Sequence, residues 1–265
     1  NVFRQLSACK EGGIWVRNWA KDYGSSNIRF LHCDFYKAGG DEVFAVWGWG
    51  GTMEHVLISG CTFYEVDAEK YRARGFYPAW FITLGQSGKR ADVRMENCIV
   101  QVKRCNTLFR MLGDGTHAVV DNCDLYLEQP DDMEKVDAYK GAHPLLVQGN
   151  DRKDGSTVIQ NCRILKGDSG RRICYRMGAL RDNYFDVECG YGPSSTKEVV
   201  GNVFHGSLYG LFWDCDVVRD NVVELTNAGF AWMSGAGEVV GNQIKMEITA
   251  DAQGGAIFHN NWNKG

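Results

Sequence analysis

One short pattern returns along the chain and constrains its fold more than any other feature. Two apolar residues at alternate positions precede a turn-forming residue, then Cys or Asn, and a further apolar residue two positions later, as in DVRMENCIV. Repetition of this kind indicates a stack of similar units, each too small to bury its own apolar face. The repeated position is held by Cys33, Cys61, Cys98, Cys123, Cys162, Asn183, Asn202, Asn221, Asn242 and, in the last unit, Asn261.

The units predict an all-β fold, a single-stranded right-handed parallel β-helix of roughly 9 to 10 coils. Each unit carries a second apolar strand upstream of the repeated position, as in FAVWGW, AWFITL and TLFRML, and no long segment has the period of a helix. The units are too short for propeller blades. Two longer steps, of 37 residues from Cys61 to Cys98 and 39 from Cys123 to Cys162, mark loops inserted into two coils. We expect residues 1–265 to form one domain that is a piece of a longer chain.

The recurrent cysteines and asparagines predict an inward structural column. Equivalent positions of a parallel β-helix stack one strand spacing apart, about 4.8 Å. Inward Asn can form an amide ladder, and Cys fits the same space as a small buried apolar residue. The Cys and His spacings match no zinc motif, so we predict no metal and no cofactor. A row of unpaired thiols favours folding in a reducing cytosol.

Composition excludes two classes of partner. The net charge is −4 and no Lys/Arg block stands out, which argues against a nucleic-acid binder. No apolar run approaches the ~18 residues that suggest a membrane span, so membrane insertion is not expected.

The Asn/Cys column and its VxIxN-style strands resemble the pectin-lyase-like right-handed β-helix superfamily, and the coil style is similar to bacteriophage tailspikes and tail appendages. That resemblance covers most of the chain and implies polysaccharide binding or cleavage, a homotrimer, and a place on the virion after cytosolic folding; a secreted protein is the alternative. The polygalacturonase motifs and the pectate-lyase calcium aspartates are not present, although GGDEVF at 39–44 comes nearest to the former. Those specific activities are therefore not carried over.

Substrate-binding candidates follow from the chemistry of sugars. Flat aromatic side chains pack against the apolar face of a sugar ring, and arginines pair with carboxylates. Charged residues inside otherwise apolar strands, such as Arg110, Arg176 and Asp214, should face outward, either toward a ligand or in a salt-bridge ladder. The predicted binding residues are Trp47, Trp49, Arg72, Arg74, Arg110, Arg176, Trp213 and Trp232.

Catalytic candidates depend on the reaction. Glycoside hydrolysis needs two carboxylates about 5 to 10 Å apart, which side chains one or two coils apart can supply. A lyase instead needs a base such as a Lys, Arg or Tyr of the segment 70–74. The predicted acid, base and assisting carboxylates for hydrolysis are Asp41, Glu42, Glu65, Asp67 and Asp214.

Three functions remain open from the sequence. The first is a tailspike-like domain that binds and cleaves a surface polysaccharide, with hydrolysis favoured over elimination. The second is a β-helix that binds glycan or a neighbouring subunit without chemistry, and the third is a free-standing polysaccharide lyase.

Overall fold

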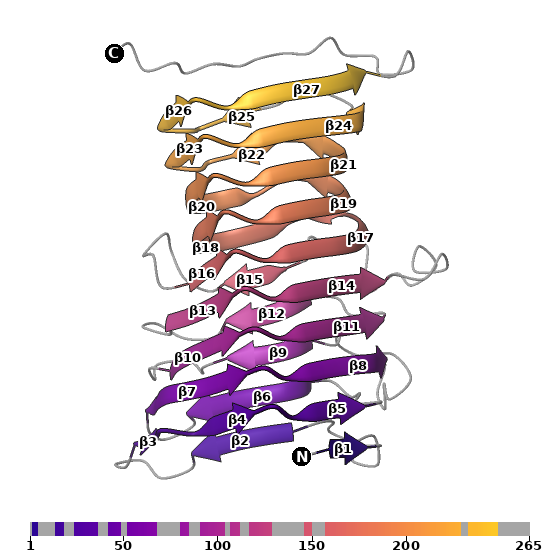
Figure 1. The fold of residues 1–265 in the computed structure, drawn as a ribbon. Helices are drawn as coiled ribbons and strands as arrows, with labels where there is room; N and C mark the ends of the chain where they lie inside the picture. Colours follow the sequence, from indigo (N-terminus) through magenta and orange to yellow (C-terminus); the bar gives the residue numbers. More distant parts are fainter. Residues whose placement is uncertain are drawn as a thin grey trace.

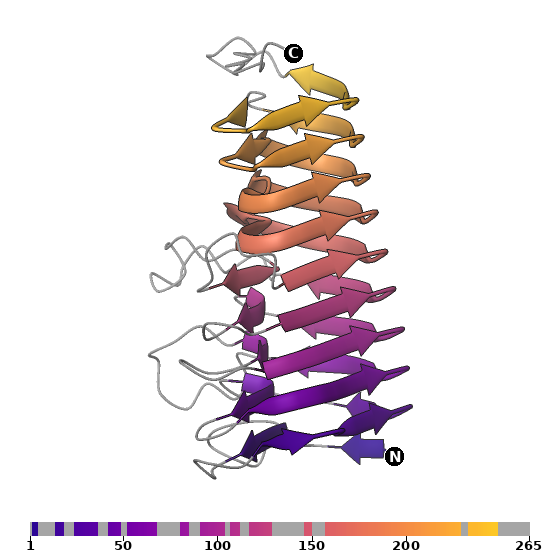
Figure 2. The same cartoon turned by 90° about the vertical axis from the view of Figure 1, so that its left-hand side faces the viewer.

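The computed structural model describes residues 2–4, 14–18, 24–36, 42–48, 52–67, 80–84, 91–103, 107–111, 117–128, 146–149, 157–228 and 233–248. This part of the chain contains strands and no helix, and therefore no helix that could span a membrane. The strands form two sheets in which every pairing is parallel, and together they build a β-solenoid (Figures 1 and 2).

The first sheet has ten strands and forms one long face, at the front right of Figure 1. Its strands, in stacking order, are β1 (Val2–Arg4), β5 (Asp34–Tyr36), β8 (Thr62–Asp67), β11 (Ile99–Lys103), β14 (Asp124–Glu128), β17 (Arg163–Arg172), β19 (Tyr184–Tyr191), β21 (Val203–Gly210), β24 (Val222–Ala228) and β27 (Gln243–Ile248).

The second sheet has seventeen strands and wraps around the remaining two faces. Its rear face stacks β2 (Ile14–Asn18), β6 (Glu42–Gly48), β9 (Trp80–Leu84), β12 (Thr107–Met111), β15 (Val147–Gly149), β22 (Phe212–Trp213) and β25 (Met233–Ser234). Its front face stacks β3 (Ser25–Ser26), β4 (Arg29–Leu31), β7 (Met53–Ser59), β10 (Ala91–Glu96), β13 (His117–Asp121), β16 (Thr157–Gln160), β23 (Val217–Arg219) and β26 (Glu238–Val240). Two strands run through both faces, β18 (Cys174–Arg181) and β20 (Ser194–Val200).

Alternation along each strand decides which side chains enter the core. In β13 the inward Ala118 and Val120 are buried, whereas His117 and Val119 are exposed or half-buried. Equivalent inward residues stack from coil to coil. The rings of Phe35 and Phe63, for example, are parallel with centroids 4.4 Å apart. The core is thus a set of columns along the solenoid axis.

The turn before each column residue explains the glycine, asparagine and aspartate that the pattern requires there. In each unit from Cys33 to Asn242, the preceding residue has a positive φ, which Gly, Asn and Asp adopt most easily. These residues are His32, Gly60, Asn97, Asn122, Asn161, Asp182, Gly201, Asp220 and Gly241.

The predicted asparagine ladder is confirmed. The Asn202 side-chain amide donates to Oδ1 of Asn221 at 3.0 Å, and its own Oδ1 accepts from the Asn183 side chain at 2.9 Å. Oδ1 also accepts from the Asn183 backbone N–H, and Nδ2 donates to the Leu180 carbonyl. Asn242 continues the ladder from Asn221, and Asn261 lies outside the described residues. Each amide satisfies backbone groups that the bend leaves without a strand partner.

The cysteine half of the column is also confirmed as structural. Cys33, Cys61, Cys98, Cys123 and Cys162 are buried, and all the cysteines in the described part of the chain are free thiols. The Cys162 thiol donates to the Gln160 carbonyl at 3.0 Å and accepts from the Cys123 backbone N–H at 3.4 Å. The thiol therefore takes over the hydrogen bonds that asparagine makes in the later coils.

Candidate functional site

The structure describes the predicted site residues unevenly. Asp41, Trp49, Arg72, Arg74 and Trp232 lie outside the described residues. Five more are described by their backbone alone, namely Glu42, Trp47, Glu65, Asp67 and Arg110. The three whose side chains are described are Arg176, Trp213 and Asp214.

Two of these three side chains come from one column of bends. Arg176, Ser195, Asp214 and Gly235 each stand seven residues before the column asparagine of their coil, and each has a positive φ. The Ser195 hydroxyl donates to Oδ2 of Asp214 at 2.9 Å, so adjacent coils are joined at this bend. Asp214 is half-buried and Arg176 is exposed. An arginine at a positive φ is unusual, because the left-handed region disfavours residues with long side chains.

Arg110 belongs to the neighbouring column. It pairs with Gln148, and Gln148 pairs with Tyr175, the residue before Arg176. The same column continues through Ser194 to Trp213. The sequence places all three charged residues at similar positions, whereas the register offsets Arg110 by one residue.

An arginine–aromatic cluster forms around Tyr175 and Trp213. The Arg172 guanidinium lies 5.4 Å from the ring centroid of Tyr175 and 5.4 Å from that of Trp213. The Arg176 guanidinium lies 4.9 Å from the Tyr175 ring. Trp213 is 41% exposed. Cation–π contacts at these distances hold the guanidinium groups beside the half-buried ring of Tyr175 and the exposed Trp213.

The backbone of Glu42 lies far from this cluster along the solenoid axis. From β6, which begins at Glu42, the pairings run through β9, β12, β15, β18 and β20 to β22. Six strand spacings correspond to roughly 29 Å along the axis. Asp214 therefore cannot form a catalytic carboxylate pair with Glu42, since such pairs lie about 5 to 10 Å apart.

Glu42 and Asp67, by contrast, share one edge of the solenoid. Asp67 ends β8, the next strand of the chain begins at Trp80, and Trp80 pairs with Glu42. Their backbones therefore flank the same turn of the solenoid. Glu65 lies in β8 opposite an irregularity in its pairing with β11.

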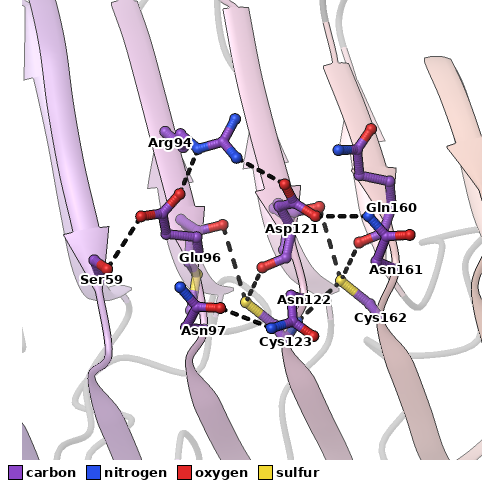
Figure 3. Close-up of polar contacts among 12 residues, drawn as sticks. Ser59, Arg94, Glu96, Asn97, Asp121, Asn122, Cys123, Gln160, Asn161 and Cys162 are labelled. Carbon is purple, nitrogen blue, oxygen red and sulfur yellow. Dashed lines mark hydrogen bonds and ion pairs between the residues drawn. The ribbon is translucent and has the colours of Figure 1, made fainter.

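A second polar cluster, which the sequence analysis missed, lies on the front face of the second sheet (Figure 3). Arg94 Nε donates to Glu96 Oε2 at 2.5 Å, and Arg94 Nη2 donates to Asp121 Oδ2 at 2.7 Å. Glu96 also accepts from the Ser59 hydroxyl, and Asp121 accepts from the Asn161 amide. We call these residues the Arg94 ladder.

Register alone could have revealed this ladder. Ser59, Glu96, Asp121 and Gln160 each stand two residues before the column cysteine of their coil, so they stack in successive coils. Counting from the cysteine places Glu96 and Asp121 side by side in adjacent coils, and Arg94, two residues before Glu96 on the same face of β10, supplies the opposite charge.

The electrostatics of the Arg94 ladder do not suit an acid catalyst. Partial burial raises the pKa of the Asp121 carboxyl. Hydrogen bonds from Asn161 and Gln160 lower it, the charge of Arg94 lowers it further, and the resulting pKa is below the usual value. A general acid of a glycosidase needs the opposite shift. The ladder is therefore best explained as structural.

The cysteine column is similarly unsuited to chemistry. A hydrogen bond to the Cys123 thiol and burial raise the pKa of Cys98 to about 12, and a hydrogen bond to Cys162 and burial do the same for Cys123. Nucleophilic and metal-binding cysteines need the thiolate, which these surroundings disfavour. Among the described residues, no group of three or more His, Cys, Asp or Glu side chains is arranged to hold a metal ion.

Comparison with known proteins gives no family assignment: no family model matches the chain, and searches of curated proteins and of solved structures find no significant match.

Proposed function

We propose that this chain is a right-handed, pectin-lyase-like β-helix that binds a surface polysaccharide through the arginine–aromatic cluster of Arg172, Tyr175, Arg176 and Trp213. The observation that carries the proposal is the pairing of the exposed Trp213 and the half-buried Tyr175 with two guanidinium groups on a long, regular surface. Asp214 lies next to Trp213 in the chain and adds a carboxylate for sugar hydroxyls.

The chemistry of the cluster suits an acidic sugar. The aromatic rings offer flat apolar surface to the C–H face of a sugar ring. Arg176 is exposed and can form a paired hydrogen bond with a ligand carboxylate. Arg172 reaches both rings, and its charge adds to the attraction for an anionic ligand.

The wider setting follows from the resemblance and from the strand directions. In Figure 1 the front strands run to the right and the rear strands to the left as the chain rises, which supports the right-handed form. We place the chain as a single solenoid module of a longer, homotrimeric tail appendage of a phage, folded in a reducing cytosol; a secreted protein is the alternative. The buried free thiols of the described residues favour folding in a reducing cytosol over secretion.

Cleavage by hydrolysis is a second candidate function. The observation that favours it is the shared edge of the solenoid, where the backbones of Glu42 and Asp67 come from neighbouring strands. Asp41 and Glu65 belong to the same two segments of the sequence. Non-catalytic binding through the arginine–aromatic cluster is the simpler alternative.

The test is a binding panel of acidic and neutral bacterial polysaccharides, read by calorimetry. We expect an acidic glycan to bind and Trp213→Ala or Arg172→Ala to weaken its affinity about 5-fold or more, since each stacked or charge-paired contact contributes on the order of 1 kcal/mol or more. Tyr184→Ala is the matched control, because Tyr184 is a similarly exposed aromatic residue on the first sheet. Unchanged affinity in both cluster variants, or no binding to any glycan, would overturn the proposal.

A further inference from the structure

A buried hydroxyl without a hydrogen-bond partner lies inside the arginine–aromatic cluster. Ser194 is 2% exposed, and its Oγ makes no hydrogen bond within the described part of the chain. The neighbouring hydroxyls differ in this respect, because Ser195 donates to Asp214 and Thr196 donates to the Ser194 carbonyl. Buried polar side-chain atoms in folded proteins are nearly always hydrogen-bonded. The Ser194 hydroxyl is therefore a group that a ligand can pair.

Register places Ser194 between the two aromatic residues of the cluster. Tyr175, Ser194 and Trp213 each stand eight residues before the column asparagine of their coil, and they pair in this order. Cys174 and Phe212, which precede the two aromatic residues, are buried in the core, so alternation turns the three side chains outward. A small side chain thus stands between two large ones, and its hydroxyl faces the space that they flank.

The Arg172 guanidinium occupies this space. Tyr175 and Trp213 lie two strand spacings apart, roughly 10 Å. The guanidinium carbon lies 5.4 Å from each ring centroid, which places it between the rings and over the strand of Ser194. Arg172 stands at the end of β17 on the first sheet and reaches this position across a corner of the solenoid. We call the space, with Ser194 at its base, the Tyr175–Trp213 slot.

The guanidinium fits the slot but does not satisfy the hydroxyl. The two rings attract its positive charge by cation–π contacts. A guanidinium carries donors only, so it offers no acceptor to the Ser194 O–H. Its position nevertheless shows which shape the slot accepts, namely a small, flat, Y-shaped group. A ligand group of that shape that also carries an acceptor can displace the guanidinium and pair the hydroxyl.

The aromatic faces decide which flat acceptor is suitable. Because these faces carry partial negative charge, they repel a carboxylate and attract C–H and N–H groups. An acetamido group has a carbonyl acceptor, an N–H and a methyl group in one plane, and it has the Y shape of a guanidinium. A carboxylate of the same glycan has a better partner in Arg176, which is exposed beside Tyr175.

We infer, on the basis of the proposed glycan-binding function, that the Tyr175–Trp213 slot binds the acetamido group of an N-acetylated amino sugar. The Ser194 hydroxyl donates to the acetamido carbonyl, and the rings of Tyr175 and Trp213 cover the two faces of the amide. Arg172 is the resident occupant that the ligand displaces, and its guanidinium then pairs with an anionic group of the glycan. The slot thereby selects glycans by their N-acetyl groups, which charge attraction alone does not distinguish.

The experiment compares matched pairs of neutral probes on the intact protein. The methyl glycosides of N-acetylglucosamine and N-acetylgalactosamine are set against those of glucose and galactose, which lack only the acetamido group. Titration measures affinity, and saturation-transfer NMR identifies the ligand protons in contact. We expect the N-acetylated member of a pair to bind about 5-fold more tightly or better, which is the contribution of roughly one neutral hydrogen bond. Its acetyl methyl protons should receive the strongest transfer.

Ser194→Ala tests the hydroxyl. It should remove about 5-fold of the affinity for the N-acetylated probes and leave the other probes unchanged. Because the lost hydroxyl is buried and unpaired, the free energy of unfolding should not fall, which separates binding from stability. Ser195→Gly is the matched control, since it removes the adjacent hydroxyl at a positive φ that glycine accepts. This control should keep the preference for the N-acetylated probes.

Arg172→Ala tests the resident occupant. An occupant that blocks a site lowers the apparent affinity by the fraction of molecules in which the site is open. Removing the guanidinium should therefore raise the affinity for the neutral N-acetylated probes, by about 5-fold or more, while the affinity for an acidic glycan falls. A gain of affinity for one class of ligand cannot result from a loss of stability.

The outcomes distinguish this inference from the proposed function. Equal affinities within both pairs, an unchanged preference in Ser194→Ala, or weaker binding of the N-acetylated probes to Arg172→Ala would each overturn the acetamido site. An acidic glycan that still binds through Trp213 and Arg172 would then leave the proposed function intact. Failure of every glycan and every probe to bind would overturn the proposed function, and the inference with it.

Discussion

Each asparagine of the ladder does more than fill space. Asn202 is fully buried, its amide donates to two backbone carbonyls and to Asn221, and its oxygen accepts two hydrogen bonds from Asn183. The substitution Asn202→Ala leaves several buried groups without partners. Because each such group costs about 1 to 3 kcal/mol, we expect the free energy of unfolding to fall by about 3 kcal/mol or more. Urea denaturation measures it.

The control for this prediction is Asn161→Gly. The Asn161 amide is exposed, it makes one hydrogen bond to Asp121, and its positive φ suits glycine. We expect a loss below about 1 kcal/mol. Equal losses in the two variants would mean that the buried ladder contributes no more than an exposed amide.

At the scale of elements, the buried thiols of the cysteine column and of Cys174 on β18 predict a loss of stability in alkali. The pKa values of Cys98, Cys123 and Cys174 are raised from 9.0 to about 12, by hydrogen bonds to neighbouring thiols and burial for the first two and by burial for Cys174. Above pH about 9 the unfolded chain releases these protons while the folded chain keeps them. Stability is therefore complete below pH about 9 and declines toward pH about 12.

Urea titrations at a series of alkaline pH values measure this decline. The variant Cys98→Ala/Cys123→Ala/Cys174→Ala is the comparison, because it removes three of the responsible groups and should show a shallower slope. Identical slopes would show that other residues cause the alkaline loss.

The Arg94 ladder joins β7, β10, β13 and β16, but we expect it to contribute little to stability. Arg94 is 48% exposed, so its ion pairs are screened by solvent. Arg94→Met should lower the free energy of unfolding by about 1 kcal/mol or less, and the difference should shrink in high salt as screening weakens the pairs it removes. A larger loss that persists in high salt would identify the ladder as a buried structural element.

The sequence predicts where the strands lie better than it predicts which side chains of different coils lie side by side. Alternation and turn residues indicate the strands. The column of Cys and Asn predicts how the strands of the first sheet and of the front face of the second sheet stack. The irregular steps at residues 61–98 and 123–162 obscure register on the rear face, so Arg110 is placed in the wrong column. Asp92 lies against His55 and His117, yet the three residues look scattered until they are counted from the cysteines. Side-chain pairing between coils depends on register, which local patterns do not contain.

The candidate site is harder to predict for the same reason. Trp213 and Arg176 are identified from the sequence as exposed residues in apolar strands, but their partner Arg172 is not, because it stands at the end of β17 on another sheet. Its contact with Trp213 spans two sheets and two coils. Such contacts arise only from the path of the chain around the solenoid.

On the scale of the whole molecule, a solenoid limits how far a local loss of stability spreads along its axis. Among the described strands, each coil pairs only with the coils directly before and after it, as β18 does with β15, β16 and β20. Stability is then close to a sum of coil and interface terms, so a local defect loosens its neighbours before it loosens distant coils. For Asn202→Ala we expect faster amide hydrogen exchange in β18 to β24, and unchanged exchange in β7 to β14.

Hydrogen exchange followed by mass spectrometry can resolve these segments. The comparison is Val120→Ala, a core substitution in β13 that removes buried apolar volume and leaves the asparagine ladder unchanged. It should reverse the pattern, with faster exchange in β10 to β16 and unchanged exchange in β21 to β27. If either variant accelerates exchange evenly along the chain, the coils unfold as one cooperative unit. Interactions between distant coils, and not only between neighbours, would then stabilise the solenoid.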